Sequence, residues 1–520
     1  MASPITRRQF VAGAALTLGA SGAASTEPTD AQPNVLVIHV DQHRIDALGA
    51  YGNTDIRTPH IDALAADGVR FVNSFCPYPV CTPSRYSMLS GVYVHQHRGW
   101  TNHSTLYPGT ETFPSILRDA GYHTKAVGKM HFTPTYLDLG FQEMALSEQN
   151  GPGRWDDDYH RELKRHGLVD RNDLEDQLRE YRRDARAEYW ETFGALPSNL
   201  PDAFHSTTWV GDRALDTIEQ WTPAGNLLMA GFIKPHHPFD PPAEWAGAYD
   251  PAKLTLLPGW TDACLPRDVA LSKGYFTNED LTEPALRRVM AYYYAAIEHI
   301  DHHVGRILAA LKRKGLYDDA LIIYTSDHGD YMGFHHMILK GNNMYDPLVK
   351  VPLIVKYPKS AHKGAVSQAL VSNLDLAPTI LAQAGRPRGP DMRGLDLADH
   401  PNGRDVILAE GRGGRHAMVR TKDRKLILAH GKGEDLFFDL HDDPEELRNR
   451  FADPERQTEI DALAQTARAW RDPDNLPKTH LDENAPIIDQ PNVPSRDDDH
   501  RDVMIAYYQE KMDGERRAEG

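Results

Sequence analysis

Three nearly continuous apolar segments of strand length, spread widely along the chain, constrain the fold most strongly. They lie at residues 34–40, 227–233 and 320–325, and residues 121–128 lead into a further, shorter strand. Apolar runs without alternation are typical of strands buried on both faces, as in a parallel sheet. Apolar residues at helical spacing fill residues 285–315, and Pro59 marks another helix start after the first strand. Strands that alternate with helices predict an α/β fold with a mainly parallel central sheet flanked by helices.

The pattern changes near residue 404. Short apolar segments separated by Gly-rich or charged turns follow at residues 406–409, 417–420, 425–428 and 436–439, which is typical of an antiparallel meander. A helix ending near Trp470 comes next, with Asp453 as its N-cap and Pro454 at its first position. We therefore predict a main domain at residues 32–403 and a smaller C-terminal α+β subdomain with its tail at 404–520.

Two charged stretches carry no motif. Residues 156–193 favour helix and contain few apolar positions, which predicts a peripheral helical insertion. The acidic tail around Asp498 is expected to be a solvated end.

The N-terminus has the order of regions of an export signal. Arg7 and Arg8 precede an apolar run of small residues at 11–24, and a small-residue segment follows. This order predicts a twin-arginine-type signal peptide at residues 1–31 and an exported protein, periplasmic or secreted. No other stretch approaches the roughly 18 apolar residues that a membrane span requires, so we expect no stable membrane anchor.

Charge and cysteine content exclude some classes of protein. The formal net charge of −17 argues against a nucleic-acid partner, because a phosphate backbone would be repelled. Three cysteines, Cys76, Cys81 and Cys264, are too few for a disulfide framework.

Cys81 lies where a loop gives way to a predicted helix over residues 84–89. The free amides and positive dipole end of a helix N-terminus make a cysteine there unusually acidic, so it could act as a nucleophile unmodified. Arg85, four residues further on, lies one turn away on the same face. A hydrolase that uses the Cys81 thiol and a cysteine that only packs beside the helix start both remain open at this point.

Polar residues follow two of the predicted strands. Asp41 and Gln42 end the first strand, and Asp327 and His328 come after the strand that ends at Thr325. In open α/β sheets, sites assemble in the loops beyond the carboxyl ends of the strands. Two carboxylates, an amide oxygen and an imidazole predict a divalent metal site that favours calcium over zinc.

Cationic and imidazole side chains gather in other loops beyond strand ends. They are Lys129 and His131, two residues apart; His236 and His237, just after a strand; and Lys340, after a histidine-rich loop. Their convergence is what a tetrahedral oxyanion requires. Asn102 follows the Cys81 helix and is a candidate substrate contact.

Six motifs in order resemble the formylglycine-dependent sulfatases of the alkaline-phosphatase-like superfamily. They are Asp41-Gln42 after an apolar strand, Cys81-Thr82-Pro83-Ser84-Arg85, Gly128-Lys129-Met130-His131, Pro235-His236-His237-Pro238-Phe239, Ser326-Asp327-His328-Gly329 and Leu339-Lys340-Gly341. Leu436-Phe437-Phe438-Asp439-Leu440 resembles the C-terminal domain of the same family. The resemblance covers about residues 34–455, and motifs in a shared order are far more specific than one alone.

The resemblance implies a role for each matching residue. Asp41, Gln42, Asp327, His328 and modified Cys81 would hold the metal ion. A formylglycine-generating enzyme would convert Cys81 to formylglycine, whose hydrate attacks sulfur and gives a covalent sulfated enzyme. Lys129 and Lys340 would bind the sulfate oxygens and Arg85 would orient the diol. His236 would protonate the leaving oxygen, with His237 as a weaker alternative that would otherwise contact the substrate. His131 would take a proton as sulfate is expelled.

Two departures from the family pattern keep alternatives open. Many sulfatases carry Asp-Asp and Asp-Asn at the ligand pairs, whereas this chain has Asp41-Gln42 and Asp327-His328. This variant resembles phosphonate monoester hydrolases and phosphodiesterases, and His328 would also suit manganese. The leading hypothesis is a sulfatase acting on sulfated carbohydrate, with a phosphonate monoester or phosphodiester hydrolase as the alternative. A non-catalytic glycan-binding protein is the rival from another class.

Overall fold

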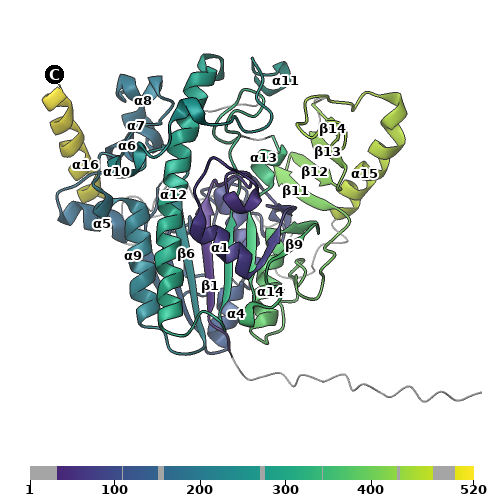
Figure 1. The fold of residues 1–520 in the computed structure, drawn as a ribbon, viewed down its shortest axis with the longest axis horizontal. Coiled ribbons are helices and arrows are strands. Elements are labelled where there is room, and N and C mark those ends of the chain that lie inside the picture. Colours follow the sequence, from purple (N-terminus) through teal and green to yellow (C-terminus); the bar gives the residue numbers. More distant parts are fainter. Residues whose placement is uncertain are drawn as a thin grey trace, which may run out of the picture. The chain divides into compact units, whose positions relative to one another are not determined.

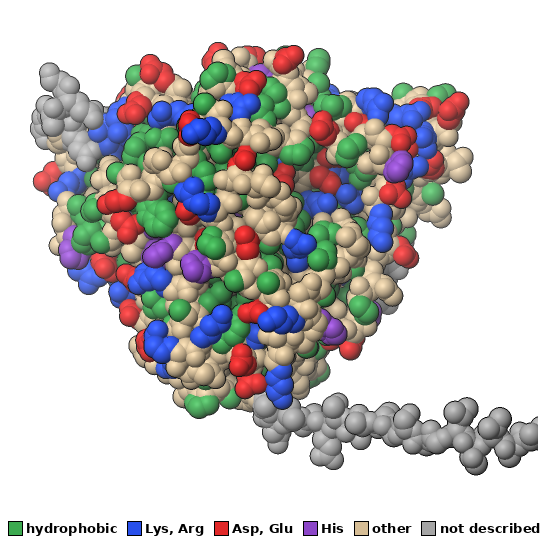
Figure 2. Space-filling model, viewed as in Figure 1, with side chains coloured by type: hydrophobic (Ala, Val, Ile, Leu, Met, Phe, Trp, Pro, Cys, Tyr) green, Lys and Arg blue, Asp and Glu red, His purple; other side chains and the backbone are tan. Residues whose placement is uncertain are grey.

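The computed structural model describes residues 32–107, 109–149, 157–269, 276–341, 343–429, 434–471 and 498–519. The predicted signal segment at residues 1–31 lies outside them. Within this part of the chain, no helix is both long and apolar enough to cross a membrane. Positive and negative side chains are interspersed over the face shown in Figure 2.

An eight-stranded sheet, in the order β5-β4-β6-β1-β7-β8-β2-β9, forms the centre of the main domain (Figure 1). The bounds are β1 Val35–Asp41, β2 Val69–Phe71, β4 His123–Gly128, β5 Glu143–Leu146, β6 Asn226–Pro235, β7 Leu321–Ser326, β8 Leu353–Lys356 and β9 Ala365–Ser367. Strands β5, β4, β6, β1 and β7 run parallel to one another, and β8 runs antiparallel to its neighbours β7 and β2. The four strands predicted from the sequence are neighbours at the centre, which confirms the mainly parallel sheet.

Helices cover both faces of this sheet. Residues Leu36, Ile38 and Val40 of β1 pack in one core with α1 (Pro59–Asp67), α9 (Ser206–Glu219) and α12 (Glu283–Arg313). The alternate residues Val35 and Val37 pack in a second core with α2 (Cys81–Ser90), α4 (Phe113–Asp119) and α14 (Leu376–Gln383). Because successive side chains of a strand point to opposite faces, a strand buried on both faces is expected to be largely apolar, and residues 35–40 of β1 are apolar except for His39.

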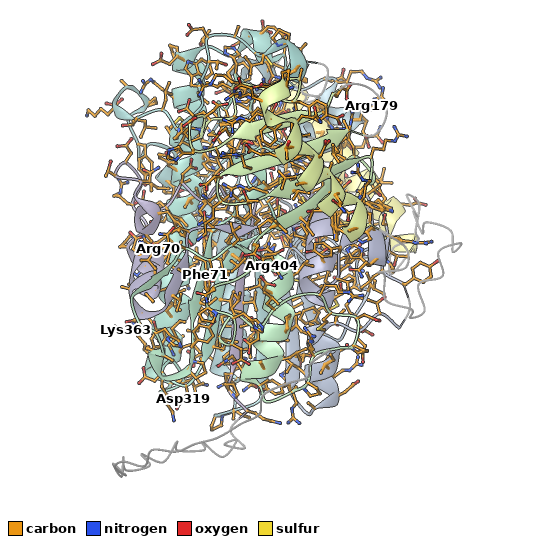
Figure 3. The ribbon with its side chains drawn as sticks, turned by 90° about the vertical axis from the view of Figure 1, so that its right-hand side faces the viewer. Arg70, Phe71, Arg179, Asp319, Lys363 and Arg404 are labelled. Carbon is orange, nitrogen blue, oxygen red and sulfur yellow. The ribbon has the colours of Figure 1, made fainter. Side chains whose placement is uncertain are left out.

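The C-terminal meander has the predicted topology. Strands β11 (Ile407–Gly411), β12 (His416–Arg420), β13 (Arg424–Ala429) and β14 (Leu436–Asp439) pair antiparallel in sequence order, and α15 (Gln457–Trp470) packs on them. The Asp453 side chain caps the 3₁₀ turn Pro454–Arg456 that leads into α15. Arg404, labelled in Figure 3, precedes this sheet and makes two hydrogen bonds of 2.7 Å with Asp375 of the main domain.

The insertion is helical as predicted, but one of its helices is buried, and the C-terminal tail differs from the expected solvated end. The insertion is helical, with α5 (Asp158–Arg165), α6 (Arg171–Gln177), α7 (Arg179–Arg182) and α8 (Ala187–Glu191). However, α6 is largely buried, and the C-terminal helix α16 (Asp498–Glu519) packs beside it instead of being a solvated end (Figure 1). Met504, Tyr508 and Met512 of α16 form one buried cluster with Val169 and Leu174. The sequence does not reveal this contact, because the few apolar residues that form it lie among many charged residues.

The remaining short elements connect these layers. They are β3 Ser74–Phe75, which pairs with β10 Val371–Ser372, and helices α3 Val94–His97, α10 Ala243–Ala246, α11 Pro266–Val269 and α13 Asp346–Val349.

Candidate active site and metal centre

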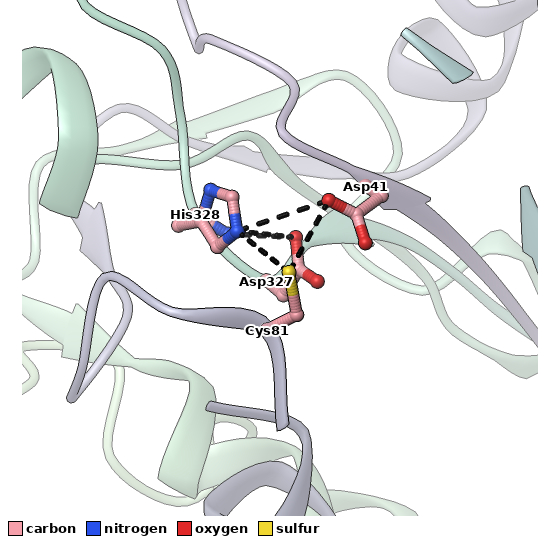
Figure 4. A group of neighbouring side chains, drawn as sticks. All are labelled: Asp41, Cys81, Asp327 and His328. Carbon is pink, nitrogen blue, oxygen red and sulfur yellow. Dashed lines mark hydrogen bonds and ion pairs between the residues drawn. The ribbon is translucent and has the colours of Figure 1, made fainter. Parts of the chain in front are cut away.

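Side chains from two neighbouring strands and one helix meet at the carboxyl edge of the sheet (Figure 4). Asp41 is the last residue of β1, and Asp327 and His328 directly follow β7, its parallel neighbour. Cys81 is the first residue of α2, which begins three residues earlier than the sequence predicts. One ligand atom from each of these four buried residues lies within 4.8 Å of the others.

Arg85 arranges the two carboxylates. Its Nε donates to Asp327 Oδ2 (2.8 Å) and its Nη2 to Asp41 Oδ2 (3.0 Å), while Lys129 Nζ lies 2.8 Å from the same Asp41 oxygen. The Oδ1 atoms of both carboxylates lie 3.8 Å from the His328 Nε2 atom, and Asp327 Oδ1 also accepts hydrogen bonds from the backbone amides of Gln42 (3.1 Å) and His328 (3.0 Å). Burial alone would raise the pKa of Asp41, but the charges of Lys129, Lys340 and Arg85 hold it well below its ordinary value. Both carboxylates are therefore ionised and present one oxygen to the centre.

Gln42 and His328 are oriented as metal ligands require. The Gln42 side-chain amide donates to Asp330 Oδ2 at 2.5 Å, and its buried Oε1 atom has no hydrogen-bond partner in the described part of the chain. His328 Nδ1 lies 2.9 Å from the Gly329 carbonyl oxygen, so Nδ1 carries the proton and Nε2 keeps its lone pair. An unsatisfied buried oxygen, two carboxylate oxygens and an imidazole nitrogen fit a divalent cation.

Cys81 lies among polar groups. Its Sγ atom lies 3.1 Å from Lys340 Nζ, 3.2 Å from His328 Nε2 and 3.7 Å from Asp41 Oδ1. Burial and the Asp41 charge would raise the pKa of the thiol, but the charges of Lys340 and Lys129 hold it below its ordinary value. Asn102, half-buried, accepts a hydrogen bond from the Thr82 backbone amide at 3.1 Å and so supports the turn that carries Cys81.

Lys340 and His236 form a proton-sharing pair. Lys340 Nζ lies 2.8 Å from His236 Nε2, and His236 Nδ1 lies 2.7 Å from the His237 carbonyl oxygen, to which it donates. Burial and the Lys340 charge hold the pKa of His236 well below its ordinary value. Burial would lower the pKa of Lys340, but the Cys81 and Asp41 charges raise it. Lys340 therefore holds the proton and donates it toward His236.

His131 is held by its backbone, in the left-handed region at φ 58°. Its amide donates to Glu148 Oε1 at 2.9 Å, and its carbonyl oxygen accepts from the Thr82 hydroxyl at 2.8 Å. Both ring nitrogens are buried and have no hydrogen-bond partner among the residues that the structure describes, so they are available to a reacting group. Glu148 also accepts from the Met130 amide at 2.9 Å, and burial raises its pKa to about 7.

His237 contacts the insertion instead of Lys340. Its Nδ1 atom lies 2.6 Å from Asp176 Oδ2 on α6, and its ring stacks on that of His236 with centroids 4.2 Å apart. The structure thus brings most of the predicted residues into one connected network, which comprises Asp41, Gln42, Cys81, Arg85, Lys129, His236, Asp327, His328 and Lys340. His131 joins it through Thr82 and Glu148, and Asn102 and His237 lie at its edges.

Three contributing residues were not identified from the sequence. Asp330 orients Gln42, Glu148 holds the loop that carries His131, and Asp176 holds His237. Asp330 could have been found by its position two residues after His328. Glu148 follows the strand β5, which is too short to stand out, and Asp176 lies in a charged helix with no distinguishing pattern.

Comparisons with known proteins agree with this geometry. Residues 33–386 match the sequence model of a family described as Sulfatase. The chain is 31% identical over 466 residues to an arylsulfatase of Clostridium perfringens, covering 83% of this chain and 93% of the relative. It is 27% identical over 510 residues to an N-acetylglucosamine-6-O-sulfatase of Bacteroides thetaiotaomicron, covering 89% and 90%. Among solved structures, phosphonate monoester hydrolase from Silicibacter pomeroyi aligns with a TM-score of 0.71 at 25% identity, covering 85% of this chain and 95% of that one.

Proposed function

This chain belongs to the sulfatase family of sulfuric ester hydrolases, and from that premise we propose that it removes sulfate from sulfated carbohydrate with a nucleophile made from Cys81. The carbohydrate substrate is supported by the relative named as an N-acetylglucosamine-6-O-sulfatase. The observation that carries the proposal is the position of Cys81. Its sulfur lies within 3.2 Å of both Lys340 and His328, in a buried cluster of charges that suits an oxyanion and does not suit an inert thiol.

We infer that Asp41, Gln42, Cys81, Asp327 and His328 hold a divalent metal, most simply Ca²⁺, with Mn²⁺ as the alternative through His328. When bound, such an ion polarises the sulfate oxygens and helps to ionise the attacking hydroxyl. The unpartnered Gln42 oxygen and the lone pair on His328 Nε2 support this ligand set.

The side chains of this protein then have separate roles in the reaction. Formylglycine at position 81, made by a formylglycine-generating enzyme, supplies a hydroxyl as its hydrate. Arg85 fixes the two carboxylates, and Lys129 and Lys340 bind the remaining sulfate oxygens. The proton shared by Lys340 and His236 passes to the leaving oxygen as the ester bond breaks. His131, whose ring nitrogens have no partner in the described structure, takes the proton of the second hydroxyl.

Peptide mass spectrometry of the segment around residue 81, in protein from its native host, tests the nucleophile. We expect the mass of formylglycine in place of cysteine. Full activity in protein that carries only the thiol would refute the formylglycine proposal and favour a cysteine hydrolase.

A second candidate, a phosphonate monoester or phosphodiester hydrolase with the same nucleophile, is favoured by one observation. The ligand pairs Asp41-Gln42 and Asp327-His328 carry less negative charge than the Asp-Asp and Asp-Asn pairs of many sulfatases, and this fits the fold shared with the phosphonate monoester hydrolase from Silicibacter pomeroyi. Turnover of 4-nitrophenyl sulfate and 4-nitrophenyl phenylphosphonate by one preparation decides between them. Faster cleavage of the phosphonate would overturn the sulfatase assignment for this chain's main activity.

We also propose that residues 1–31 direct export to the periplasm or medium, that 32–403 form the catalytic domain and that 404–520 form a C-terminal subdomain with its tail. The paired arginines and the apolar run after them support the export signal. Fusion of residues 1–31 to a reporter that is active only after export is expected to give activity. Replacement of Arg7 and Arg8 by lysine should abolish it.

A further inference from the structure

The insertion places a carboxylate behind the histidine pair of the active site. Asp176, on α6, is fully buried. Its Oδ2 atom lies 2.6 Å from His237 Nδ1, and its Oδ1 atom accepts a hydrogen bond from the Tyr189 hydroxyl at 2.7 Å. Burial would raise the pKa of Asp176, but His237 and Tyr189 hold it below its ordinary value. The Asp176 side chain is therefore a carboxylate anion that faces His237.

The contact continues from Asp176 to the proton donor. The His237 ring stacks on the His236 ring at an interplanar angle of 28°. The His237 carbonyl oxygen accepts from His236 Nδ1 (2.7 Å) and from Gln149 Nε2 (2.6 Å). These contacts fix the plane and the tautomer of His236, so its Nε2 atom faces Lys340 at 2.8 Å. A displaced His237 would therefore displace the nitrogen that shares the proton with Lys340.

We propose that Asp176 is a positioning residue for the hydrolysis: through His237 it holds His236 in the orientation in which His236 and Lys340 protonate the leaving oxygen. This inference rests on the proposed function of the same site. Asp176 touches no reacting atom, and its effect passes through two stacked rings. The alternative is an ion pair that only anchors α6 to the main domain.

The two roles differ in how they depend on the leaving group. Protonation of the leaving oxygen has little effect on the rate when the alcohol has a low pKa, as nitrophenol does. It has a large effect when the alcohol has a high pKa. A positioning role for Asp176 therefore weighs most on esters of weakly acidic alcohols, the class to which sugar hydroxyls belong. A purely structural role would lower turnover of every ester by the same factor.

The test is Asp176→Asn, assayed on aryl sulfates graded from 4-nitrophenyl to 4-methoxyphenyl sulfate. We expect kcat to fall about 100-fold for the 4-methoxyphenyl ester and about threefold for the 4-nitrophenyl ester, with KM within about threefold for both. The matched control is Glu180→Gln, the same chemical change at an exposed position on α7, which should leave the whole series unchanged.

Each outcome decides one point. An equal loss across the series, or none, overturns the positioning role. If Asp176→Asn does not fold, Tyr189→Phe removes one hydrogen bond to the same carboxylate. This variant should show the same graded pattern, with a loss of kcat roughly a tenth as large. An equal loss of kcat for all esters in Tyr189→Phe would overturn the inference. A wild-type protein that cleaves none of the sulfates refutes the proposed function, whereas active wild type with a flat response in the variants refutes only the role of Asp176.

Discussion

The two sides of the active site are built in different ways. On the strand-end side, Asp41 and Asp327 follow β1 and β7, whose parallel register pairs Val40 with Ser326. On the insertion side, Asp176 lies on α6, which is held by a small apolar cluster with the C-terminal helix α16. The sheet fixes the first side through its own hydrogen bonds, whereas the second depends on packing between segments distant in sequence. The proposed nucleophile and metal ligands thus lie on the side that the sheet positions, and Asp176, the proposed support for His236 and His237, lies on the side that depends on tertiary packing.

The two sides also differ in the kind of interaction that holds them, which is ionic on one side and apolar on the other. The strand-end side concentrates fully buried charges that neutralise one another, with Arg85 and Lys129 against Asp41 and Asp327. Removal of one member would leave a partner charge unpaired, at a cost of about 3–5 kcal/mol. The apolar cluster between α6 and α16 contains five fully buried side chains, and its loss would affect the insertion first.

The largest expected effect is on the strand-end side. Cys81→Ala should reduce turnover by at least about 10⁴-fold, because the nucleophile is removed, while the melting temperature stays near that of the wild type. Cys264→Ala, the same change at a partly buried cysteine outside the site, should keep full activity. Assays of kcat beside thermal melts check both. Residual activity near the wild-type level in Cys81→Ala would place the nucleophile elsewhere.

Removal of the metal is the next largest effect. Dialysis against a chelator should reduce activity more than about tenfold and lower the melting temperature, because Asp41 and Asp327 would lose a shared counter-charge. Addition of Ca²⁺ or Mn²⁺ singly should restore both, and metal analysis of the restored protein identifies the ion. Unchanged activity and melting temperature in protein shown to be metal-free would contradict a metal site on this side.

Particular residues show what sequence could predict. Asp41, Asp327 and His328 were identifiable because strand ends in a parallel sheet meet at one edge, a rule that needs only the strand pattern. Asp176 was not, because its approach to His237 depends on where the insertion packs. The packing of α16 on α6 was likewise unpredictable, since Met504, Tyr508 and Met512 are few among charged neighbours. Local pattern predicts what the sheet positions and fails where tertiary packing decides.

A third prediction concerns Glu148, which follows β5 next to Gln149 and lies between the two sides. Burial raises its pKa to about 7, above the ordinary value of 4.5. The native state therefore binds more protons than the unfolded state between about pH 4.5 and 7, so stability falls as pH rises through this window, by roughly 3 kcal/mol.

Glu148→Gln removes this dependence and keeps an acceptor for the Met130 and His131 amides, so it should be more stable than the wild type at pH 8 and similar at pH 4.5. Denaturant unfolding at both pH values measures this difference. Glu148→Ala, which also removes the acceptor, should lose activity at every pH. If Glu148→Gln and the wild type showed the same pH dependence of stability, the Glu148 carboxyl would not be the source of that dependence.

The smallest expected effect lies on the insertion side. Met504 is fully buried against the insertion, whereas its neighbour Val503 is 46% exposed, so Met504→Asp and Val503→Asp place the same charge on the two faces of α16. Met504→Asp should speed amide exchange in α5 and α6 and lower kcat by at most about tenfold, because α6 carries Asp176 but no metal ligand. Metal content should not change, and Val503→Asp should alter neither exchange nor kcat. If Met504→Asp instead released the metal or abolished turnover, the two sides would not be separable, since a change in α16 would then affect the strand-end side as strongly as a change within that side.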